Sequence, residues 1–237
     1  MTAHRKSMQS VLVFDLNGTL TDLSVLDPHF QNAFGTADAR REWFNEMIQL
    51  SMVSTMTGYY VEFPKLAKAS LDAVAARYRV RLSEEAVAAI VAGTRTAPAF
   101  PDVKPALERL RDAGFRMAVL TNSPLGSAEA VLRNAEIYES FERVLSVDAI
   151  RTYKPSAEVY RYGAAQLKIP LTSMLMIAAH AWDTTGAIRA GCTAAFLERP
   201  FEVLDSLAPR PRFIAPDLGA LATQLLQSDG LANVAGI

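Results

Sequence analysis

The sequence predicts an α/β fold in which a parallel sheet is covered by helices and a helical segment is inserted after the first strand. Short apolar runs alternate with longer amphipathic segments along most of the 237 residues, which is the pattern of a parallel sheet with helices on its faces. Residues 24–97 break this alternation, because they contain long helical patterns without a strand between them. We therefore expect one α/β domain from residues 1–23 and 98–237, and a small helical domain from residues 24–97.

The first predicted strand spans residues 11–14, a Val-Leu-Val-Phe run that ends at Asp15 and has the β-branched and aromatic side chains favoured in buried strands. Similar runs predict further strands at residues 115–120, 143–146, 175–179 and 193–197. Amphipathic segments predict helices between them at residues 102–113, 127–134, 155–167 and 184–190. Pro155 is expected in the first turn of its helix, and Gly114 and Gly191 are expected to end theirs. The last twenty residues, 218–237, are expected to form one helix and a loose end.

The inserted segment contains three helical patterns, at residues 41–57, 63–78 and 83–92. Ser83 is followed by two glutamates, which is typical of a helix N-cap with acidic residues in the first turn. The Thr-Ala-Pro-Ala-Phe-Pro stretch at residues 96–101 is interpreted as a linker back to the core.

Composition and charge exclude several classes of protein. With 24 Lys and Arg against 25 Asp and Glu, the net charge of −1 argues against electrostatic capture of nucleic acid or of an anionic membrane. The single Cys192 cannot form an internal disulfide, and three histidines far apart in the chain argue against a dedicated transition-metal site. The apolar runs at residues 11–14 and 174–179 are too short for a signal-peptide core or a membrane span. A cytoplasmic location is expected.

Polar side chains follow four of the predicted strands. They are Asp15, Asn17 and Thr19 after the first, Thr121, Asn122 and Ser123 after the second, Tyr153 and Lys154 after the third, and His180 and Asp183 after the fourth. Taken singly, each has an ordinary structural explanation, such as a turn, a cap or a solvated side chain. Ligands of open parallel sheets, however, bind outside the carboxyl ends of the strands. Two carboxylates, one ammonium and several hydroxyl and amide groups at one edge therefore predict a catalytic site.

Four motifs, in this order, resemble the haloacid dehalogenase superfamily. They are Phe-Asp-Leu-Asn-Gly-Thr-Leu at 14–20, Leu-Thr-Asn-Ser at 120–123, Tyr-Lys-Pro at 153–155 and His-Ala-Trp-Asp at 180–183. Residues 146–155 and 181–187 are the stretches most similar to the type II L-2-haloacid dehalogenases. The similarity extends over residues 11–199 and includes the insertion, which corresponds to the small cap domain of that family. It implies a Rossmann-like core, no cofactor, and hydrolysis of a short (S)-2-haloacid or haloacetate to a 2-hydroxy acid and halide.

The resemblance also implies roles for individual residues. Asp15 would be the nucleophile that displaces the halide and forms an aspartyl ester. Lys154 would stabilise the ionised form of Asp15 and attract the small anionic substrate. Asp183 would orient Lys154 and help to position or activate water. The groups implied to hold carboxylate oxygens or to lie near the site are the side chains of Thr19, Thr121 and Tyr160 and the backbone N–H groups of Leu16, Asn17 and Asn122.

The second position of the first motif bears on metal dependence. Phosphatases of this superfamily need a second acid there, with further acids near the fourth strand, to hold Mg²⁺. Mg²⁺ prefers octahedral oxygen coordination with carboxylate ligands, but this chain has Asn17 at that position and only Asp183 in the fourth motif. The sequence therefore favours metal-free displacement at carbon, with no metal ligands among the site residues.

The chain departs from the family pattern at several positions. Phe44 stands where the family has a cap arginine that draws off the halide, and Arg40 or Arg41 could take its place only if the helix register differs from this alignment. Asn17 replaces a tyrosine, Ala178 a serine and His180 an asparagine. We hypothesise that His180, with Asn122 and Trp43, replaces part of the halide site. Trp43 and Phe44 belong to an apolar surface of the insertion that also includes Met47, Met52 and Met56.

Other functions stay open at this stage. One is a phosphatase or phosphonate-cleaving enzyme of the same fold, and another is a non-catalytic protein that has kept the fold, for which the missing arginine is the main argument. A hydrolase that uses Cys192 is a third, although no basic partner is evident in the sequence. Family members are often homodimers, and the sequence alone does not decide whether this chain is one.

Overall fold

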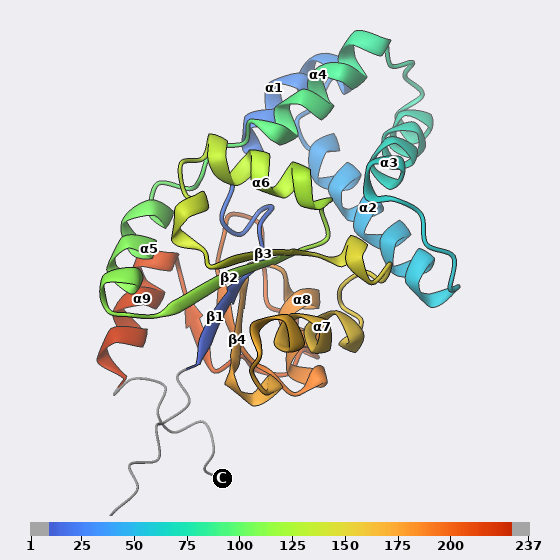
Figure 1. The fold of residues 1–237 in the computed structure, drawn as a ribbon. Helices are drawn as coiled ribbons and strands as arrows, with labels where there is room; N and C mark the ends of the chain where they lie inside the picture. Colours follow the sequence, from blue (N-terminus) through green and yellow to red (C-terminus); the bar gives the residue numbers. More distant parts are fainter. Residues whose placement is uncertain (1–9, 229–237) are drawn as a thin grey trace, which may run out of the picture.

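The structure is a computed structural model that describes residues 10–228. A six-stranded parallel sheet forms its centre (Figure 1). The strands are β1 (Val11–Phe14), β2 (Arg116–Thr121), β3 (Arg143–Ser146), β4 (Met174–Ala178), β5 (Thr193–Leu197) and β6 (Phe213–Ala215), in the spatial order β3-β2-β1-β4-β5-β6. The first five are the predicted strands, with bounds that differ by one residue at most. β6 was not predicted, because its three residues are mostly half-exposed and give no apolar run.

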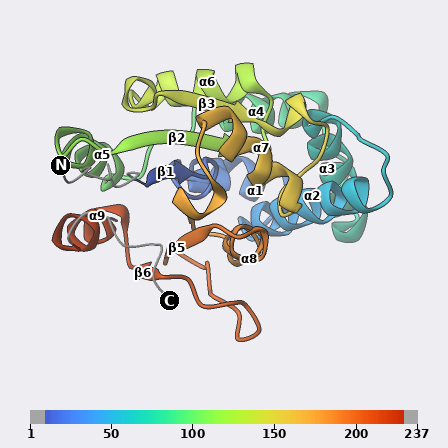
Figure 2. The same cartoon turned by 60° about the horizontal axis from the view of Figure 1, so that its bottom comes forward.

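Helices cover both faces of the sheet. One face packs against α5 (Val103–Asp112), α6 (Leu125–Asn134) and α9 (Leu218–Gln227), and the other against α7 (Ala157–Leu167) and α8 (Ala181–Ala190). In both views α5 and α9 lie side by side (Figure 1, Figure 2). Leu12 and Phe14 point into the cluster with α5, and Val11 and Val13 into the cluster with α7. Burial on both faces explains why β1 is a continuous apolar run in the sequence.

Residues 23–95, which we name the helical insertion, lie together beyond the carboxyl ends of the strands (Figure 1). They form a 3₁₀ turn, η1 (Leu23–Leu26), and four helices, α1 (Asp27–Phe34), α2 (Ala39–Met56), α3 (Phe63–Tyr78) and α4 (Glu84–Arg95). The backbone N–H of Asp22 donates to the carbonyl of Pro98 at 2.8 Å, so the chain enters and leaves the insertion at one point. The three predicted helices are confirmed, and Ser83 caps α4 by accepting a hydrogen bond from the backbone N–H of Ala86. The eight-residue α1 was not predicted.

Four helices begin two or three residues away from their predicted starts. Helices α2 and α6 each begin two residues earlier than predicted, at Ala39 and Leu125. Helix α7 begins at Ala157, because the Ser156 side chain accepts a hydrogen bond from the backbone N–H of Glu158 and caps it. Pro155 therefore precedes the helix. Helix α8 begins at Ala181, so Asp183 lies in its first turn and not in a loop.

The loose end predicted after α9 lies almost wholly in residues 229–237, outside the described residues. Within residues 10–228, no helix combines the length and the apolar character needed to cross a membrane.

Candidate active site

Three charged side chains from separate parts of the chain meet at the carboxyl edge of the sheet. Asp15 follows β1, Lys154 lies in the loop after β3, and Asp183 lies in α8. The Nζ atom of Lys154 is 3.1 Å from Oδ1 of Asp15 and 2.8 Å from Oδ2 of Asp183. All three residues are buried. The prediction that these strand ends come together is confirmed, because parallel strands share one carboxyl edge.

Oδ2 of Asp15, the oxygen that Lys154 does not contact, has two side-chain partners of its own. The Thr19 hydroxyl donates to Oδ2 of Asp15 at 2.8 Å, and Nδ1 of His180 lies 3.2 Å from the same oxygen. The backbone N–H of Ala179 donates to Oγ1 of Thr19 at 3.0 Å. Because this bond occupies an acceptor site of the hydroxyl, its proton is directed at Asp15.

These contacts keep Asp15 ionised. Burial alone raises the pKa of Asp15, but the positive charge of Lys154 and the hydrogen bonds from His180 and Thr19 lower it well below its ordinary value. Burial lowers the pKa of Lys154, yet Asp15 and Asp183 together raise it above its ordinary value. A charged carboxylate and a charged ammonium therefore face each other in a site with little access to water.

Asp183 differs from Asp15 in its electrostatics. Its Oδ1 accepts a hydrogen bond from the Tyr160 hydroxyl at 2.7 Å, and its Oδ2 accepts the one from Lys154. Burial raises the pKa of Asp183, and the charge of Asp15 adds to this rise because two carboxylates share one ammonium. Asp183 and Tyr160 thus hold Lys154 in place from the side away from Asp15.

The amide and hydroxyl groups after β2 play separate parts. Oδ1 of Asn122 accepts a hydrogen bond from the backbone N–H of Lys154 at 3.0 Å, which holds the Lys154 loop against β2. Nδ2 of Asn122 is buried and has no hydrogen-bond partner among the described residues. Oγ1 of Thr121 accepts from the backbone N–H of Ser123, and Nδ2 of Asn17 donates to Oγ of Ser123 at 2.9 Å. Asn122 therefore offers a donor that the protein itself leaves free.

The turn after β1 brings backbone groups to the same place. The side chain of Leu16 lies in the core, so only its backbone can serve the site. The N–H groups of Leu16 and Asn17 donate to no acceptor within residues 10–228. Gly18 has a φ of 74°, and a Cβ atom there would lie 3.1 Å from Nε2 of His180. Glycine thus permits both the turn and the close approach of His180.

The helical insertion contributes aromatic side chains to the site. The ring of Phe44 stacks on His180 with centroids 5.3 Å apart, and Trp182 stacks near it at 5.1 Å. The indole N–H of Trp43 donates to the carbonyl of Ala67 inside the insertion. Trp43 therefore offers its ring, and not an N–H donor, to the site. The hypothesis of a shared halide site stays a prediction for Asn122, whose Nδ2 is free.

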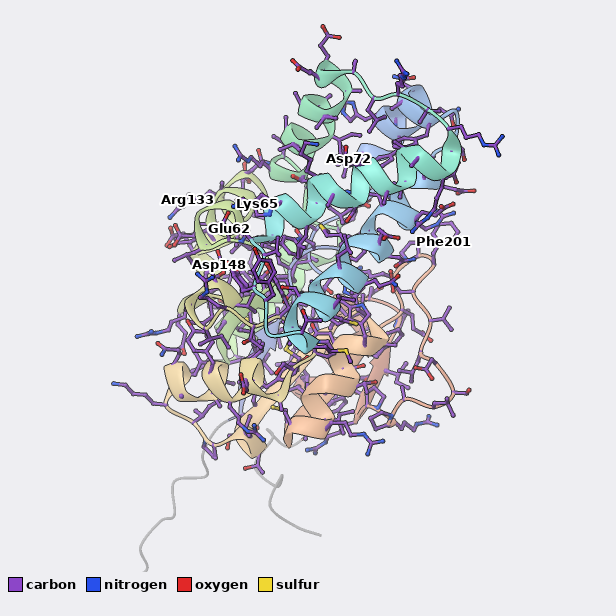
Figure 3. The ribbon with its side chains drawn as sticks, turned by 90° about the vertical axis from the view of Figure 1, so that its right-hand side faces the viewer. Glu62, Lys65, Asp72, Arg133, Asp148 and Phe201 are labelled. Atoms are coloured by element: carbon purple, nitrogen blue, oxygen red, sulfur yellow. The ribbon has the colours of Figure 1, made fainter. Side chains whose placement is uncertain are left out.

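No arginine stands in place of Phe44. Arg40 pairs with Asp27, and Arg41 pairs with Asp38. Both arginines and Phe44 line a polar cavity of about 460 Å³ that also includes His180, Arg199 and Glu202. The guanidinium of Arg41 lies 4.0 Å from the centroid of the Phe201 ring, which Figure 3 shows at the edge of the molecule beside α2.

A second, apolar cavity of about 120 Å³ lies between the insertion and the core. Phe44 lines this cavity as well, so its ring separates the two spaces. The polar residues that line the apolar cavity are Asn17, Thr94, Arg95, Ser123 and Ser127. Its wall is formed mainly by Leu23, Trp43, Met47, Phe63, Pro64, Ala67, Val91, Pro124 and Val131.

The insertion also forms hydrogen bonds with the loop that contains Lys154. The backbone N–H of Tyr153 donates to Oγ1 of Thr55 at 3.0 Å, and the Tyr153 hydroxyl donates to the carbonyl of Val61 at 2.7 Å. The Tyr60 hydroxyl donates to Asp148 of the core, and Figure 3 shows Asp148 below Glu62, which lies between α2 and α3. The position of Lys154 therefore depends on the insertion as well as on the sheet.

Sequence reasoning missed two residues near the site. Arg199 donates from Nε to the carbonyl of Thr19 at 3.1 Å and binds Asp102 with two hydrogen bonds. It follows β5, so extending the strand-end rule to the fifth strand would have found it. Glu202, whose Oε1 lies 3.9 Å from Nε2 of His180, belongs to a loop and has no sequence signal that pairs it with His180.

Cys192 is buried, and burial raises the pKa of its thiol to about 12. Its hydrogen-bond partner is Sδ of Met174 at 3.7 Å. This environment opposes a thiolate nucleophile. Within the described part of the chain, no group of three or more His, Cys, Asp or Glu side chains is arranged to hold a metal ion.

Comparisons with known proteins found a matching family and similar relatives. A family model described as haloacid dehalogenase-like hydrolase matches residues 10–191. The (S)-2-haloacid dehalogenase H-109 of Pseudomonas putida is 27% identical over 217 residues, which cover 91% of this chain and 97% of that protein. The haloacetate dehalogenase H-2 of Moraxella sp. (strain B) is 27% identical over 212 residues, or 89% of this chain and 95% of that protein. The structure of L-2-haloacid dehalogenase from Xanthobacter autotrophicus with chloropropionic acid covalently bound has a TM-score of 0.84 and 22% identity, and covers 94% of this chain and 100% of that one.

Proposed function

Because the chain belongs to the haloacid dehalogenase-like hydrolase family, we propose that it converts a short (S)-2-haloacid or a haloacetate to a 2-hydroxy acid and halide. The observation that carries this proposal is the buried pair of Asp15 and Lys154, which face each other at 3.1 Å. An ionised carboxylate shielded from water is a reactive nucleophile toward carbon. The relatives named as (S)-2-haloacid and haloacetate dehalogenases support the substrate class.

In the first step, the carboxylate of Asp15 attacks C2 of the substrate from the side opposite the halogen. The new C–O bond forms as the carbon–halogen bond breaks, and the halogen leaves with the bonding electron pair as halide. Nucleophile and substrate are both anions, and the positive charge of Lys154 offsets their repulsion. Thr19 holds the oxygen of Asp15 that Lys154 does not contact, and Asp183 with Tyr160 keeps Lys154 in place.

The substrate carboxylate is bound by donors that the protein leaves free. These are the backbone N–H groups of Leu16 and Asn17, and the free Nδ2 of Asn122 is left for the halide. The hydroxyl of Thr121 lies in the same turn. The alkyl group lies toward the apolar cavity, against Trp43 and Phe44. The helical insertion forms most of a small domain at residues 24–97, and this domain acts as the cap that closes the cavity.

In the second step, water attacks the carboxyl carbon of Asp15 and releases the 2-hydroxy acid. The bond between C2 and its new oxygen stays intact, so the configuration at C2 is inverted once. Splitting the hydrolysis into two displacements gives each a lower barrier than direct attack by water on C2.

The reaction needs no metal ion in this proposal. Asn17 provides an amide where a metal-dependent phosphatase has an acid, and this amide is bonded to Ser123. The ammonium of Lys154 lies between Asp15 and Asp183, so charge compensation comes from a side chain. The alternative is a phosphatase or phosphonate hydrolase, for which Mg²⁺ would be required.

One assay decides between these functions. Halide release is measured in excess EDTA with fluoro-, chloro- and bromoacetate and with both enantiomers of 2-chloropropionate, and phosphate release is measured from a generic aryl phosphate with Mg²⁺. We expect metal-independent halide release, with (S)-2-chloropropionate preferred, and its loss by Asp15→Asn. The exposed-site variant Asp112→Asn should behave as wild type. Mg²⁺-dependent phosphate release without halide release would establish the phosphatase, and neither activity would favour a non-catalytic protein.

The cytoplasmic location, expected from the short apolar runs of the sequence, and the homodimer, suggested by the family resemblance, stay predictions. Light scattering of the purified protein tests the homodimer through the mass of the particle in solution.

A further inference from the structure

His180 is held in one orientation by four neighbours. The rings of Phe44 and Trp182 stack against it at 5.3 and 5.1 Å. Its Nδ1 lies 3.2 Å from Oδ2 of Asp15, and its Nε2 lies 3.9 Å from Oε1 of Glu202. Both nitrogens of a buried imidazole therefore face carboxylates, one of which is the proposed nucleophile.

On the basis of the dehalogenase function proposed above, we propose that His180 is the general base that takes a proton from the water attacking the Asp15 ester. Glu202 is its positioning residue. A general base must lie within hydrogen-bond reach of the attacking water. Because Nδ1 of His180 is already within that distance of the Asp15 carboxyl group, a water approaching the carboxyl carbon from this side comes within its reach.

The proton on His180 responds to the chemical state of Asp15. In the free enzyme, Asp15 can only accept a hydrogen bond, so Nδ1 bears a proton. Burial lowers the pKa of His180, but the hydrogen bond and charge of Asp15, with smaller effects from Glu202 and Asp183, raise it above its ordinary value. Ester formation turns the Asp15 carboxylate into a neutral group and removes the largest raising influence. His180 then loses the Nδ1 proton to solvent and keeps the Nε2 proton, which faces Glu202. The basic form thus arises only once the ester exists.

The proton transfers balance in this second step. The water oxygen forms a bond to the carboxyl carbon of Asp15 as one water proton moves to Nδ1 of His180 and the carbonyl electron pair moves to its oxygen. When the intermediate collapses, the ester C–O bond breaks, and the oxygen on C2 keeps the electron pair and takes the proton from Nδ1. Asp15 is left as a carboxylic acid that contains the water oxygen, and its ionisation restores the free enzyme. One haloacid and one water give one hydroxy acid, one halide and one proton.

Asp183 is the other candidate for the base, and its contacts oppose that role. Its two carboxylate oxygens already accept hydrogen bonds from Lys154 and Tyr160. Among the described contacts it reaches Asp15 only through Lys154. A proton taken up by Asp183 would remove the negative charge that holds Lys154, whereas His180 faces Asp15 directly.

The test separates the two chemical steps. His180→Gln and His180→Asn keep an N–H donor near Asp15 but cannot act as a base. With (S)-2-chloropropionate, we expect both variants to release about one equivalent of halide per site in a first burst, as the wild type does. Their steady-state rate should then fall on the order of 10²–10⁴-fold, and mass spectrometry should detect a propionate adduct on Asp15. His29→Gln, in the helical insertion, is the matched control and should keep the wild-type steady-state rate, with no more adduct on Asp15 than the wild type shows.

Glu202 is tested through the pH profile. Removing its negative charge in Glu202→Gln lowers the pKa of His180, so the rate of ester hydrolysis should reach half its maximum at lower pH while the burst is unchanged. Glu198→Gln is the control, because Glu198 lies in the same loop after β5 but is exposed. It should leave the pH profile unchanged. If Glu202 has only a structural role, Glu202→Gln would change the rates of ester formation and ester hydrolysis equally and would not shift the pH profile of ester hydrolysis.

Several results would overturn the proposal. Steady-state turnover of His180→Gln within about threefold of the wild type would exclude a general base, and so would loss of the burst itself, which would place His180 in the first step. Should both variants fail to fold, the wild type still decides. Rapid quenching measures the rate of ester hydrolysis in the wild type as a function of pH. This rate must fall about tenfold for each pH unit below the pKa of His180, while the rate of ester formation stays constant. A wild type that releases no halide from any haloacid refutes the dehalogenase function itself, and this proposal with it.

Discussion

Nζ of Lys154 lies 3.1 Å from Oδ1 of Asp15, although the two residues are 139 positions apart in the chain. Lys154 has no exposed surface, and Asp15 has 6% of its surface exposed. The same ammonium binds Asp183 at 2.8 Å. A buried cation between two buried anions makes the charges of this site interdependent, and four predictions follow from it and from its surroundings.

Lys154→Met leaves Asp15 and Asp183 buried side by side without a positive charge. Because removal of one partner of a buried ion pair costs about 3–5 kcal/mol, we expect the free energy of unfolding to fall by roughly that amount and halide release to be lost. Urea denaturation followed by circular dichroism measures the change. Lys68→Met, at an exposed pair with Asp72, should cost less than about 1 kcal/mol. Equal effects of the two substitutions would contradict the prediction.

Thr19→Val replaces a hydroxyl by a methyl group of similar size. It removes the donor to Asp15 and leaves the buried backbone N–H of Ala179 without an acceptor. The unsatisfied N–H costs about 1–3 kcal/mol of stability, and a less well-held nucleophile lowers kcat more than it raises KM. Thr19→Ser keeps the hydroxyl and should restore most of both quantities. If the serine variant is as impaired as the valine variant, the hydroxyl contact is not the cause.

The stability of the protein should fall between neutral and alkaline pH because of His180. Its pKa in the folded protein is above its ordinary value, so its contribution to stability is fully present below about pH 6.5 and is lost as the pH rises through the folded value. Asp15 has the opposite sign: its pKa is lowered, so its contribution is lost only in acid, below about pH 4. Urea midpoints of wild type and His180→Asn should therefore converge as the pH rises from 6 to 9. A constant difference over this range would be evidence against the raised pKa of His180.

Ala67→Leu fills part of the apolar cavity next to Trp43 and Phe63. Each methylene group that no longer fits forfeits about 0.8 kcal/mol, or roughly fourfold in kcat/KM. We expect kcat/KM for 2-chlorobutyrate to fall about tenfold or more, with chloroacetate nearly unaffected. Ala76→Leu, exposed on the same helix, should change neither. A uniform loss for both substrates would mean that the cavity does not receive the alkyl group.

Much of this fold could be predicted from local patterns. Strands β1 to β5 are buried on one or both faces, and burial requires the apolar runs that mark them in the sequence. The convergence of Asp15, Lys154 and Asp183 was also predictable, because residues that follow neighbouring parallel strands share one edge. Helix α1 and strand β6 were missed since they are short and depend on tertiary packing for their stability.

The sequence by itself determined the element order and the types of side chain at the strand ends. Only the tertiary structure decided which atoms pair, because order along the chain does not specify how α2 and the loop after β5 approach the sheet. That approach brings Phe44 onto His180 and Glu202 toward its Nε2. It also turns Nδ1 of His180 toward Asp15. The chemical role of a histidine depends on the partners of its two nitrogens, and for His180 those partners come from positions far apart in the chain.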